Sequence, residues 1–256
     1  MNLSAAVLEF ADEPVSGLLA QATLKPVGDC GLLVEFGSHI CDEVSRRVLQ
    51  LDEALSNEKI HGVVEAIVAY TSLLVVFDPH LADYDGLARR MTSLASAPPS
   101  MRAKTRRWRV PVAYGGVFGL DLEDACDRLG MSPADLAAAH AGADYTIAMF
   151  GFLPGFAYLS GLPSWLALPR RASPRARIFS GSIAIGGSQT AIGSIEGPSG
   201  WNVIGRTPLR TFDAERYPAT IFEPGDNVRL EPITIEQFHE LAARAESGEM
   251  VAERVA

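Results

Sequence analysis

The amino-acid sequence predicts two domains, an α+β domain in the first hundred residues and an all-β barrel after it. The first part alternates apolar runs of strand length with two segments of helical periodicity. The second part, from residue 145 to residue 231, loses this periodicity and breaks into short strands separated by glycine and proline turns. A chain of 256 residues is long enough for two such domains.

The domain at residues 22–100 is predicted to have a split-βαβ, or ferredoxin-like, α+β fold. An apolar run at 32–36 predicts a strand, and two β-branched runs, VVEAIVAY and SLLVVFDP, predict a hairpin. Helices are expected before and after the hairpin, because apolar residues recur there at intervals of three and four. These residues are Val44, Val48, Leu51 and Leu55 before it, and Tyr84, Leu87, Met91 and Leu94 after it. A further strand at 107–113 would complete the sheet.

The domain at residues 101–235 is predicted to be a closed or nearly closed antiparallel β-barrel, preceded by a pair of short helices at 120–142. Gly130 divides this pair, and the sequence MSPADL supplies the start of its second helix. The pair superficially resembles a DNA-reading helix-turn-helix, but its second helix has no Arg, Lys, Asn or Gln to contact a base. We therefore expect it to close one end of the barrel. A helix and tail are expected at 236–256.

Composition excludes several classes of protein. The net charge of −9 argues against a nucleic-acid partner, and the three scattered cysteines argue against a disulfide framework or a metal site. Residues 1–21 contain no signal-peptide pattern and are expected to form a flexible extension. No run approaches the roughly 18 apolar residues that span a bilayer, so we expect a cytoplasmic protein without a membrane partner.

The stretch at residues 145–195 is rich in glycine, proline and aromatic residues and contains no Asp, Glu, His, Cys or Lys. Its ionised side chains are Arg170, Arg171, Arg175 and Arg177. Arg170 and Arg175 each follow a proline, and a guanidinium suits a carboxylate or a phosphate. We predict that these two face a ligand or a partner, and that Arg171 and Arg177 face solvent. The stretch therefore indicates recognition of an anion without groups for acid–base chemistry.

Neighbouring loops extend this candidate site. Gly155, Gly186 and Gly187 could offer backbone amides to an anion, the alternative being that they only turn the corners of the barrel. The side chains that such loops would present to a substrate are Tyr158, Gln189, Trp201, Asn202 and Arg206. His140 is the candidate for a catalytic base, with a helix cap as the alternative. No GxxxxGK[ST] sequence occurs, and no metal site is expected.

Five segments resemble, in order, the signatures of one family. They are GDCGLLVEFG, VPVAYGGVFGLDL, GFLPGFAYLSGL, PRRASPRARIFSGSIAIGGSQT and PSGWNVIGRTP. The family is that of the B-type subunit of 5-oxoprolinase, also known as allophanate hydrolase subunit 1 or the sporulation-kinase inhibitor family. The resemblance covers about residues 22–235 and implies an α+β domain followed by a cyclophilin-like β-barrel. The chain departs from the family pattern at AIGS, where GIYP is common.

The resemblance implies that the chain is one component of an ATP-dependent 5-oxoprolinase, which converts 5-oxoproline to glutamate. A homologous C-type subunit would complete a shared active site around the acidic substrate, and a further, A-type subunit would belong to the complex. ATP, with Mg²⁺ as its candidate companion, would bind the complex and not this chain alone. The family leaves two alternatives, a protein that binds and inhibits a histidine kinase and a component of an allophanate- or urea-amidolyase-type amide hydrolase. A peptidyl-prolyl isomerase would rest on analogy of fold alone.

Overall fold

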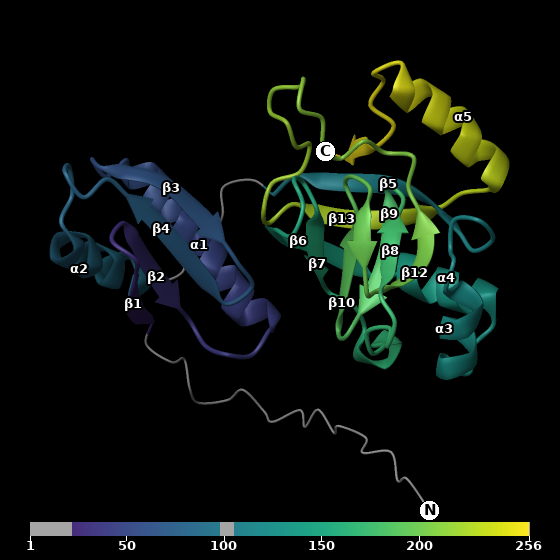
Figure 1. Ribbon diagram of the computed structural model, residues 1–256, viewed down its shortest axis with the longest axis horizontal. Helices are drawn as coiled ribbons and strands as arrows, with labels where there is room; N and C mark the ends of the chain where they lie inside the picture. Colours follow the sequence, from purple (N-terminus) through teal and green to yellow (C-terminus); the bar gives the residue numbers. More distant parts are fainter. Residues whose placement is uncertain (1–21, 98–104, 256) are drawn as a thin grey trace, which may run out of the picture.

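A computed structural model describes residues 22–97 and 105–255. Residues 22–97 form an N-terminal domain, and residues 105–255 form a second domain built around a barrel (Figure 1). The predicted extension at 1–21 lies outside the described residues. Within the described ranges, no helix is long and apolar enough to cross a membrane.

The N-terminal domain is an antiparallel sheet of four strands with two helices packed against its apolar face. The strands are β1 (Thr23–Val27), β2 (Gly31–Glu35), β3 (Val63–Val68) and β4 (Ser72–Phe77), and the helices are α1 (Asp42–Glu58) and α2 (Tyr84–Ala95). The strand order is β1-β2-β4-β3, so β4 separates β2 from β3, the two strands that α1 connects. The core forms because alternate residues of β2 and β4, including Leu32, Val34, Leu73 and Val75, point to the helices and are fully buried.

One strand of this sheet differs from the prediction. The strand expected at 107–113 is β5 (Arg107–Tyr114), and it belongs to the barrel. The place beside β2 is taken by β1, whose sequence TLKPV contains Pro26 and lacks a clear apolar alternation. A proline is tolerated in β1 because β1 is an edge strand. The ferredoxin-like classification of this domain stays a prediction.

Seven strands of the second domain close into the barrel. They are β5 and, along the chain, β6 (Asp144–Phe150), β7 (Ala157–Ser160), β9 (Ser182–Gly186), β10 (Gln189–Ile192), β12 (Asn202–Arg206) and β13 (Asn227–Pro232). Their order is β12-β9-β10-β7-β6-β13-β5, and β5 pairs back with β12 to close the ring. The predicted barrel is confirmed, but it is mixed and not purely antiparallel. The exception is β13, which runs parallel to β5.

The interior of the barrel is filled by every second residue of its strands. The residues that point inward include Ile147, Leu159, Ile183, Ile185, Ile192 and Ile204, each at most 1 % exposed. The helices α3 (Leu122–Leu129) and α4 (Pro133–Ala141) lie in the predicted interval and add buried apolar residues to the same core. They therefore close one end of the barrel, as expected (Figure 1).

Smaller elements lie outside the ring. A two-stranded ribbon pairs β8 (Arg175–Ile178) with β11 (Gly197–Ser199), and a short 3₁₀ helix, η1, covers Ser164–Leu166. After the barrel, α5 (Ile235–Glu246) packs its Phe238 against Phe118, with ring centroids 4.1 Å apart. The tail then returns as β14 (Glu253–Val255), which pairs with β5.

Candidate functional site

An aromatic cluster covers the outer face of strands β7, β9 and β10. Side chains alternate along a strand, so Tyr158, Ala184 and Ala191 point away from the barrel core. The two alanines leave room for the rings of Phe156, Tyr158 and Trp201, which we name the aromatic wall. Their centroids lie 4.9 Å apart for Phe156 and Tyr158, and 5.7 Å apart for Tyr158 and Trp201.

Gly186 seats Trp201 on this face. A Cβ atom at Gly186 would lie 2.4 Å from the indole ring, a separation that no real side chain shows. Gly186 therefore permits close packing of Trp201, a role that differs from both the anion-binding and the barrel-corner interpretations of its sequence. Gln189 pairs with Gly186 across the β9–β10 hairpin and shares the outward face with Ala191, two positions on. Gln189 thus lies at the border of the aromatic wall.

Arg170 lies over the aromatic wall as an uncommitted cation. Its guanidinium carbon is 5.7 Å from the Trp201 ring centroid, and the side chain is exposed. No carboxylate or hydrogen-bond acceptor among the described residues pairs with it. The backbone around it is held firmly, because Asn202 Nδ2 donates to the Pro169 carbonyl at 3.0 Å and the Arg171 amide donates to the Gly200 carbonyl at 2.7 Å. The structure therefore fixes the loop and leaves the cation unpaired among the described residues, and the role of Arg170 toward a ligand or a partner stays a prediction.

Arg171 and Arg175 share one buried carboxylate beside this loop. Asp121 is 2 % exposed, and its Oδ1 accepts from Arg171 Nη1 and, at 2.5 Å, from Arg175 Nη2. Its Oδ2 accepts from the Val203 amide at 2.9 Å. Arg171 is therefore not solvated as predicted, because the fold brings Asp121 to it. Arg175, predicted to face a ligand, donates a hydrogen bond from one terminal nitrogen to the same carboxylate.

The same pair of arginines carries unused hydrogen-bond donors. The Nε atoms of Arg171 and Arg175 are buried and have no acceptor among the described residues. A buried donor left without an acceptor costs about 1–3 kcal/mol. Three arginines and one carboxylate therefore give this corner a surplus of positive charge and of donors. Arg177, further along β8, faces solvent as predicted and forms an exposed ion pair with Glu196.

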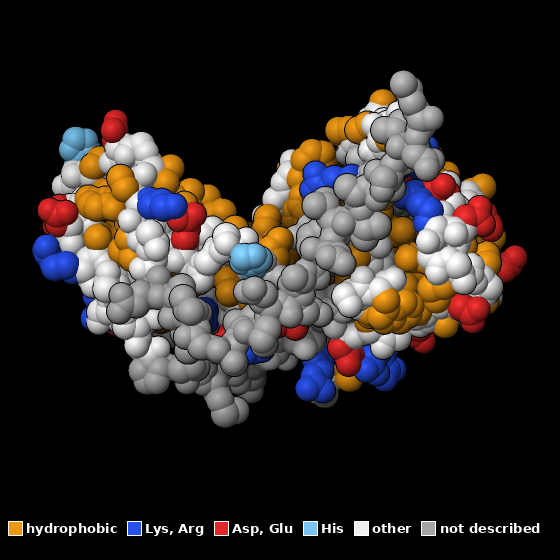
Figure 2. Space-filling model, turned by 90° about the horizontal axis from the view of Figure 1, so that it is seen from below, with side chains coloured by type: hydrophobic (Ala, Val, Ile, Leu, Met, Phe, Trp, Pro, Cys, Tyr) orange, Lys and Arg blue, Asp and Glu red, His pale blue; other side chains and the backbone are white. Residues whose placement is uncertain are grey.

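The N-terminal domain contacts the aromatic wall through Tyr70. Its hydroxyl donates to the Leu159 carbonyl at 3.3 Å, and its ring meets Tyr158 edge-on at 6.2 Å. Burial raises the pKa of Tyr158, so its hydroxyl stays neutral near pH 7. Figure 2 shows the two domains as lobes with a hollow between them and apolar side chains on both sides of that hollow.

Phe152 marks the rim of the site. It is 61 % exposed and has a φ of 67°, in the left-handed region that side chains other than glycine rarely adopt. Its ring meets Phe156 edge-on, at a centroid distance of 5.7 Å. An exposed aromatic residue on a strained backbone is more typical of a binding surface than of packing.

His140 is enclosed in the barrel core and does not reach the site. It is 0 % exposed, and its ring nitrogens lie 2.9 Å from the Tyr114 hydroxyl and 2.9 Å from the Thr190 hydroxyl. Burial lowers its pKa from 6.5 to about 3, so the imidazole is neutral. Its position supports neither a catalytic base nor an exposed helix cap.

The remaining predicted site residues are also placed elsewhere. A Cβ atom at Gly155 would lie 2.6 Å from Phe212, so this glycine permits close packing. The Gly187 amide donates to the Leu168 carbonyl at 2.7 Å and is not available to an anion. Arg206 lies at the far end of β12 from Trp201 and faces α5.

The assembled site is therefore made of Arg170, the aromatic wall and Gln189, beside the Arg171–Asp121–Arg175 cluster. Sequence reasoning missed Asp121 and Tyr70, because nothing in the local sequence links them to the loop. Asn202 was expected to face a substrate, but its amide instead donates to the Pro169 and Ile185 carbonyls. Within the described ranges, no three His, Cys, Asp or Glu side chains converge as metal ligands would. The chemistry that the site offers is recognition of a small anion against aromatic rings.

Comparison with known proteins identifies the family of this chain. Residues 22–222 match the family model described as carboxyltransferase domain, subdomain C and D. The chain belongs to this carboxyltransferase-domain family.

Two curated relatives of this carboxyltransferase-domain chain carry one name, that of the B-type subunit of 5-oxoprolinase. The protein from Bacillus subtilis (strain 168) is 33 % identical over an alignment of 227 residues, and the match covers 84 % of this chain and 95 % of the relative. The protein from Haemophilus influenzae is 36 % identical over 205 residues, which are 80 % of this chain and 95 % of the relative. The urea amidolyase of K. lactis shares the fold, with a TM-score of 0.76 at 19 % identity. The match covers 96 % of this chain and 17 % of that one.

Proposed function

We propose that this chain is the B-type subunit of an ATP-dependent 5-oxoprolinase and that it forms a shared active site with a homologous C-type subunit. The observation that carries the proposal is the uncommitted Arg170 over the aromatic wall, next to two arginines that share one carboxylate. The substrate 5-oxoproline and the product glutamate both carry a carboxylate. A guanidinium beside an aromatic ring suits the carboxylate and the flat ring of 5-oxoproline together.

A partner is needed because the site provides binding without acid–base groups. Opening a lactam requires proton transfer, and the described titratable groups near Arg170 are arginines, a neutral tyrosine and Asp121, whose buried carboxylate is paired with two arginines. We propose that the C-type subunit supplies these groups across the hollow between the domains, and that an A-type subunit joins the same complex. The names of the curated relatives, which are subunits, support an assembly of this kind. We place the complex in the cytoplasm, with no nucleic acid or membrane as a partner.

ATP belongs to the proposal at the level of the complex. The described residues do not fit a Mg²⁺ site, because no group of three carboxylate or imidazole ligands converges among them. Gly187 is the exposed glycine of the β9–β10 turn, and its amide donates to the Leu168 carbonyl, so it is not available to a phosphate. We therefore derive no step through ATP from this chain and assign the nucleotide to the partner subunits.

Reconstitution tests the assignment. The chain is combined with candidates for the C-type and A-type subunits encoded beside its own gene, and release of glutamate and phosphate is measured with 5-oxoproline and ATP. We expect turnover with all three proteins and none when this chain is left out. A complex that hydrolyses allophanate but leaves 5-oxoproline intact would keep the amide-hydrolase class and contradict the substrate.

The first prediction concerns Arg170. Arg170→Ala is expected to lower kcat/KM for 5-oxoproline by about 10- to 100-fold, which is the loss of one charge-assisted hydrogen bond. Arg229→Ala is the matched control, since Arg229 is an exposed arginine that pairs with Asp144. Asp144 begins β6, at the end of that strand away from the aromatic wall. Arg175→Ala is less informative because it would also leave the buried Asp121 with one arginine fewer. Wild-type turnover of Arg170→Ala would contradict the placement of the substrate.

A further inference from the structure

A second cavity lies between α5 and the barrel, away from the aromatic wall. Its volume is about 430 Å³, within the range of small-molecule sites. Four segments meet there: the loop after β5, the turn before β9, the end of β12 with the loop after it, and α5. The walls include Phe118, Leu209 and Phe238, which are at most 6 % exposed. The cavity therefore has an apolar body built from ordered side chains.

Arg206, Arg210 and Glu246 are the charged side chains that line this cavity, and Arg206 is the one held between aromatic rings. Its guanidinium carbon lies 5.1 Å from the Phe179 ring centroid and 5.5 Å from that of Phe238, so two rings hold it from different elements. Nε donates to the Ser180 carbonyl at 2.8 Å. The two terminal nitrogens have no hydrogen-bond partner, and no carboxylate lies within 4 Å, among the residues that the structure describes. Arg206 is thus fixed in place with a pair of donors left over.

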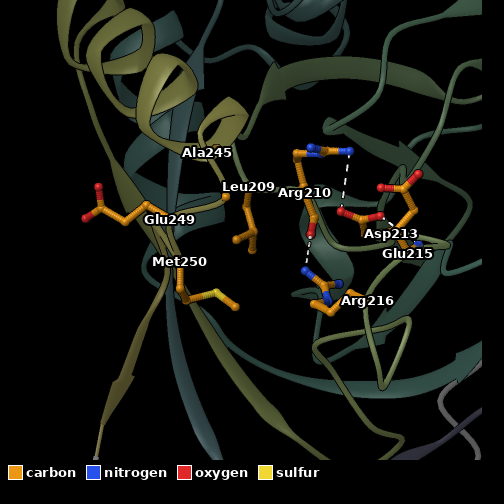
Figure 3. A pocket seen from close by; sticks show the side chains of 9 residues that line it. Leu209, Arg210, Asp213, Glu215, Arg216, Ala245, Glu249 and Met250 are labelled. Carbon is orange, nitrogen blue, oxygen red and sulfur yellow. Dashed lines mark hydrogen bonds and ion pairs between the residues drawn. The ribbon is translucent and has the colours of Figure 1, made fainter.

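The arginines of an adjacent cavity differ from Arg206, because they are paired with groups of their own loop. That cavity, of about 260 Å³, shares Leu209, Arg210 and Ala245 with the first (Figure 3). Its Arg216 donates to four backbone carbonyls of its own loop, at 2.9–3.3 Å. Arg210 pairs with Asp213 at 3.5 Å, as Figure 3 shows. Arg210 and Arg216 therefore stabilise their own loop, whereas the two terminal nitrogens of Arg206 have no hydrogen-bond partner among the described residues.

We propose that the cavity between α5 and the end of β12 binds a small carboxylate with an apolar body. Two terminal guanidinium nitrogens match the two oxygens of a carboxylate, and the apolar body would lie against Phe118, Phe238 and Leu209. His239, exposed at the rim, adds a polar edge. The site is separate from Arg170, because Trp201 and Arg206 lie five residues apart along an extended chain, a distance on the order of 15 Å. It does not depend on the 5-oxoprolinase proposal.

Benzoate is a suitable probe because it combines a carboxylate with a flat apolar ring. Binding is followed by ¹⁹F NMR of the full chain labelled with fluorophenylalanine, with the Phe118, Phe179 and Phe238 resonances assigned by substitution. We expect saturable shifts of these resonances, with a Kd on the order of 1 mM for so small a ligand. Benzyl alcohol, which has the ring without the charge, and inorganic phosphate, which has the charge without the ring, should bind at least about tenfold more weakly.

Variants locate the binding. Arg206→Met keeps a long stem between the two phenylalanine rings and removes the charge, so it should weaken benzoate binding at least about tenfold. Arg177→Met, at an exposed arginine of β8, is the matched control and should bind as the wild type does. Ala242→Leu fills the cavity from α5 and should also weaken binding without touching Arg206. Melting curves confirm that each variant is folded.

Any of three binding results would overturn the proposal, as would the loss of charge selectivity given last. They are the absence of saturable shifts with benzoate, wild-type affinity in both Arg206→Met and Ala242→Leu, and shifts confined to Phe152 and Phe156 at the aromatic wall. Equal binding of benzoate and benzyl alcohol would show an apolar cavity that does not select a charge and would also contradict the proposal.

Discussion

His140 joins elements across the barrel interior through hydrogen bonds that define its protonation state. The Thr190 hydroxyl donates to the Ala184 carbonyl at 3.0 Å, so it accepts from Nε2–H of His140. Nδ1 is then left to accept from the Tyr114 hydroxyl. The Tyr145 hydroxyl also donates to the His140 carbonyl, at 2.7 Å. All these hydrogen bonds form only when the imidazole is neutral. Protonation of His140 at acidic pH should therefore lower the free energy of unfolding.

The second prediction follows from the pKa of His140. Unfolded, the imidazole takes up a proton near pH 6.5, and folded, only near pH 3, so its contribution to stability is complete above pH 6.5 and declines as the pH falls toward 3. The wild type should lose about 2–3 kcal/mol more unfolding free energy than His140→Gln between about pH 6.5 and 4.5. Urea unfolding at the two pH values measures this difference. His80→Gln, at an exposed histidine, should behave as the wild type, and parallel curves for all three proteins would contradict the prediction.

At the scale of single residues, the sequence could indicate which side chains recognise an anion but not which are neutralised. Arg170 was singled out because it follows a proline in a stretch without acids, and it stacks over Trp201 without a carboxylate partner among the described residues. Arg175 has the same local pattern, yet its partner Asp121 is 54 positions away. For His140 the local sequence was also misleading. Its position at the end of a helix suggests exposure, but strand β10 covers it. Local sequence shows chemical type, and tertiary packing decides availability.

The third prediction belongs to the strands β9 and β12, whose close approach seats the aromatic wall. Gly186→Ala would place a methyl group 2.4 Å from the Trp201 ring. We expect a loss of about 1–3 kcal/mol in unfolding free energy and a displaced indole, because the core cannot shift without moving a strand. Gly193→Ala is the matched control, since its nearest contact would be an ordinary 3.4 Å. Urea unfolding followed by tryptophan fluorescence reports both effects, and equal midpoints for the two variants would argue against this role of Gly186.

At the scale of elements, periodicity predicted the helices better than the strands. The two apolar helices of the N-terminal domain appear where intervals of three and four indicated them. β5 was assigned to the wrong sheet, because a strand sequence carries no information about which partner it pairs with. β1 was missed because an edge strand with a proline has little alternation to detect. The parallel pairing of β13 with β5 depends on chain topology and has no local signal.

At the scale of the molecule, the two domains meet where the candidate site lies. β3 lies beside β6, and Tyr70, in the turn between β3 and β4, reaches the outer face of β7. The same residue is tied to its own domain, because the Ser45 hydroxyl on α1 donates to the Tyr70 carbonyl at 3.0 Å. Tyr70 therefore couples α1 to the strand that carries Tyr158. The position of the N-terminal domain and the access to the aromatic wall should vary together.

The fourth prediction tests this coupling. Tyr70→Ala removes both the ring contact with Tyr158 and the hydrogen bond to Leu159, while the apolar cores of the two domains stay intact. Contacts between domains of one chain are small, so losing a buried tyrosine should let the domains separate. We expect a larger radius of gyration in small-angle X-ray scattering, with far-ultraviolet circular dichroism unchanged.

Two further variants separate the ring from the hydroxyl. Tyr70→Phe keeps the ring and loses only a 3.3 Å hydrogen bond, so it should scatter as the wild type does. Tyr217→Ala removes a fully exposed tyrosine from the barrel domain and controls for the loss of an aromatic side chain. If Tyr70→Ala kept the wild-type radius of gyration, other contacts would hold the domains together. Tyr70 would then shape the aromatic wall without controlling access to it, and only the turnover of the reconstituted complex would register its loss.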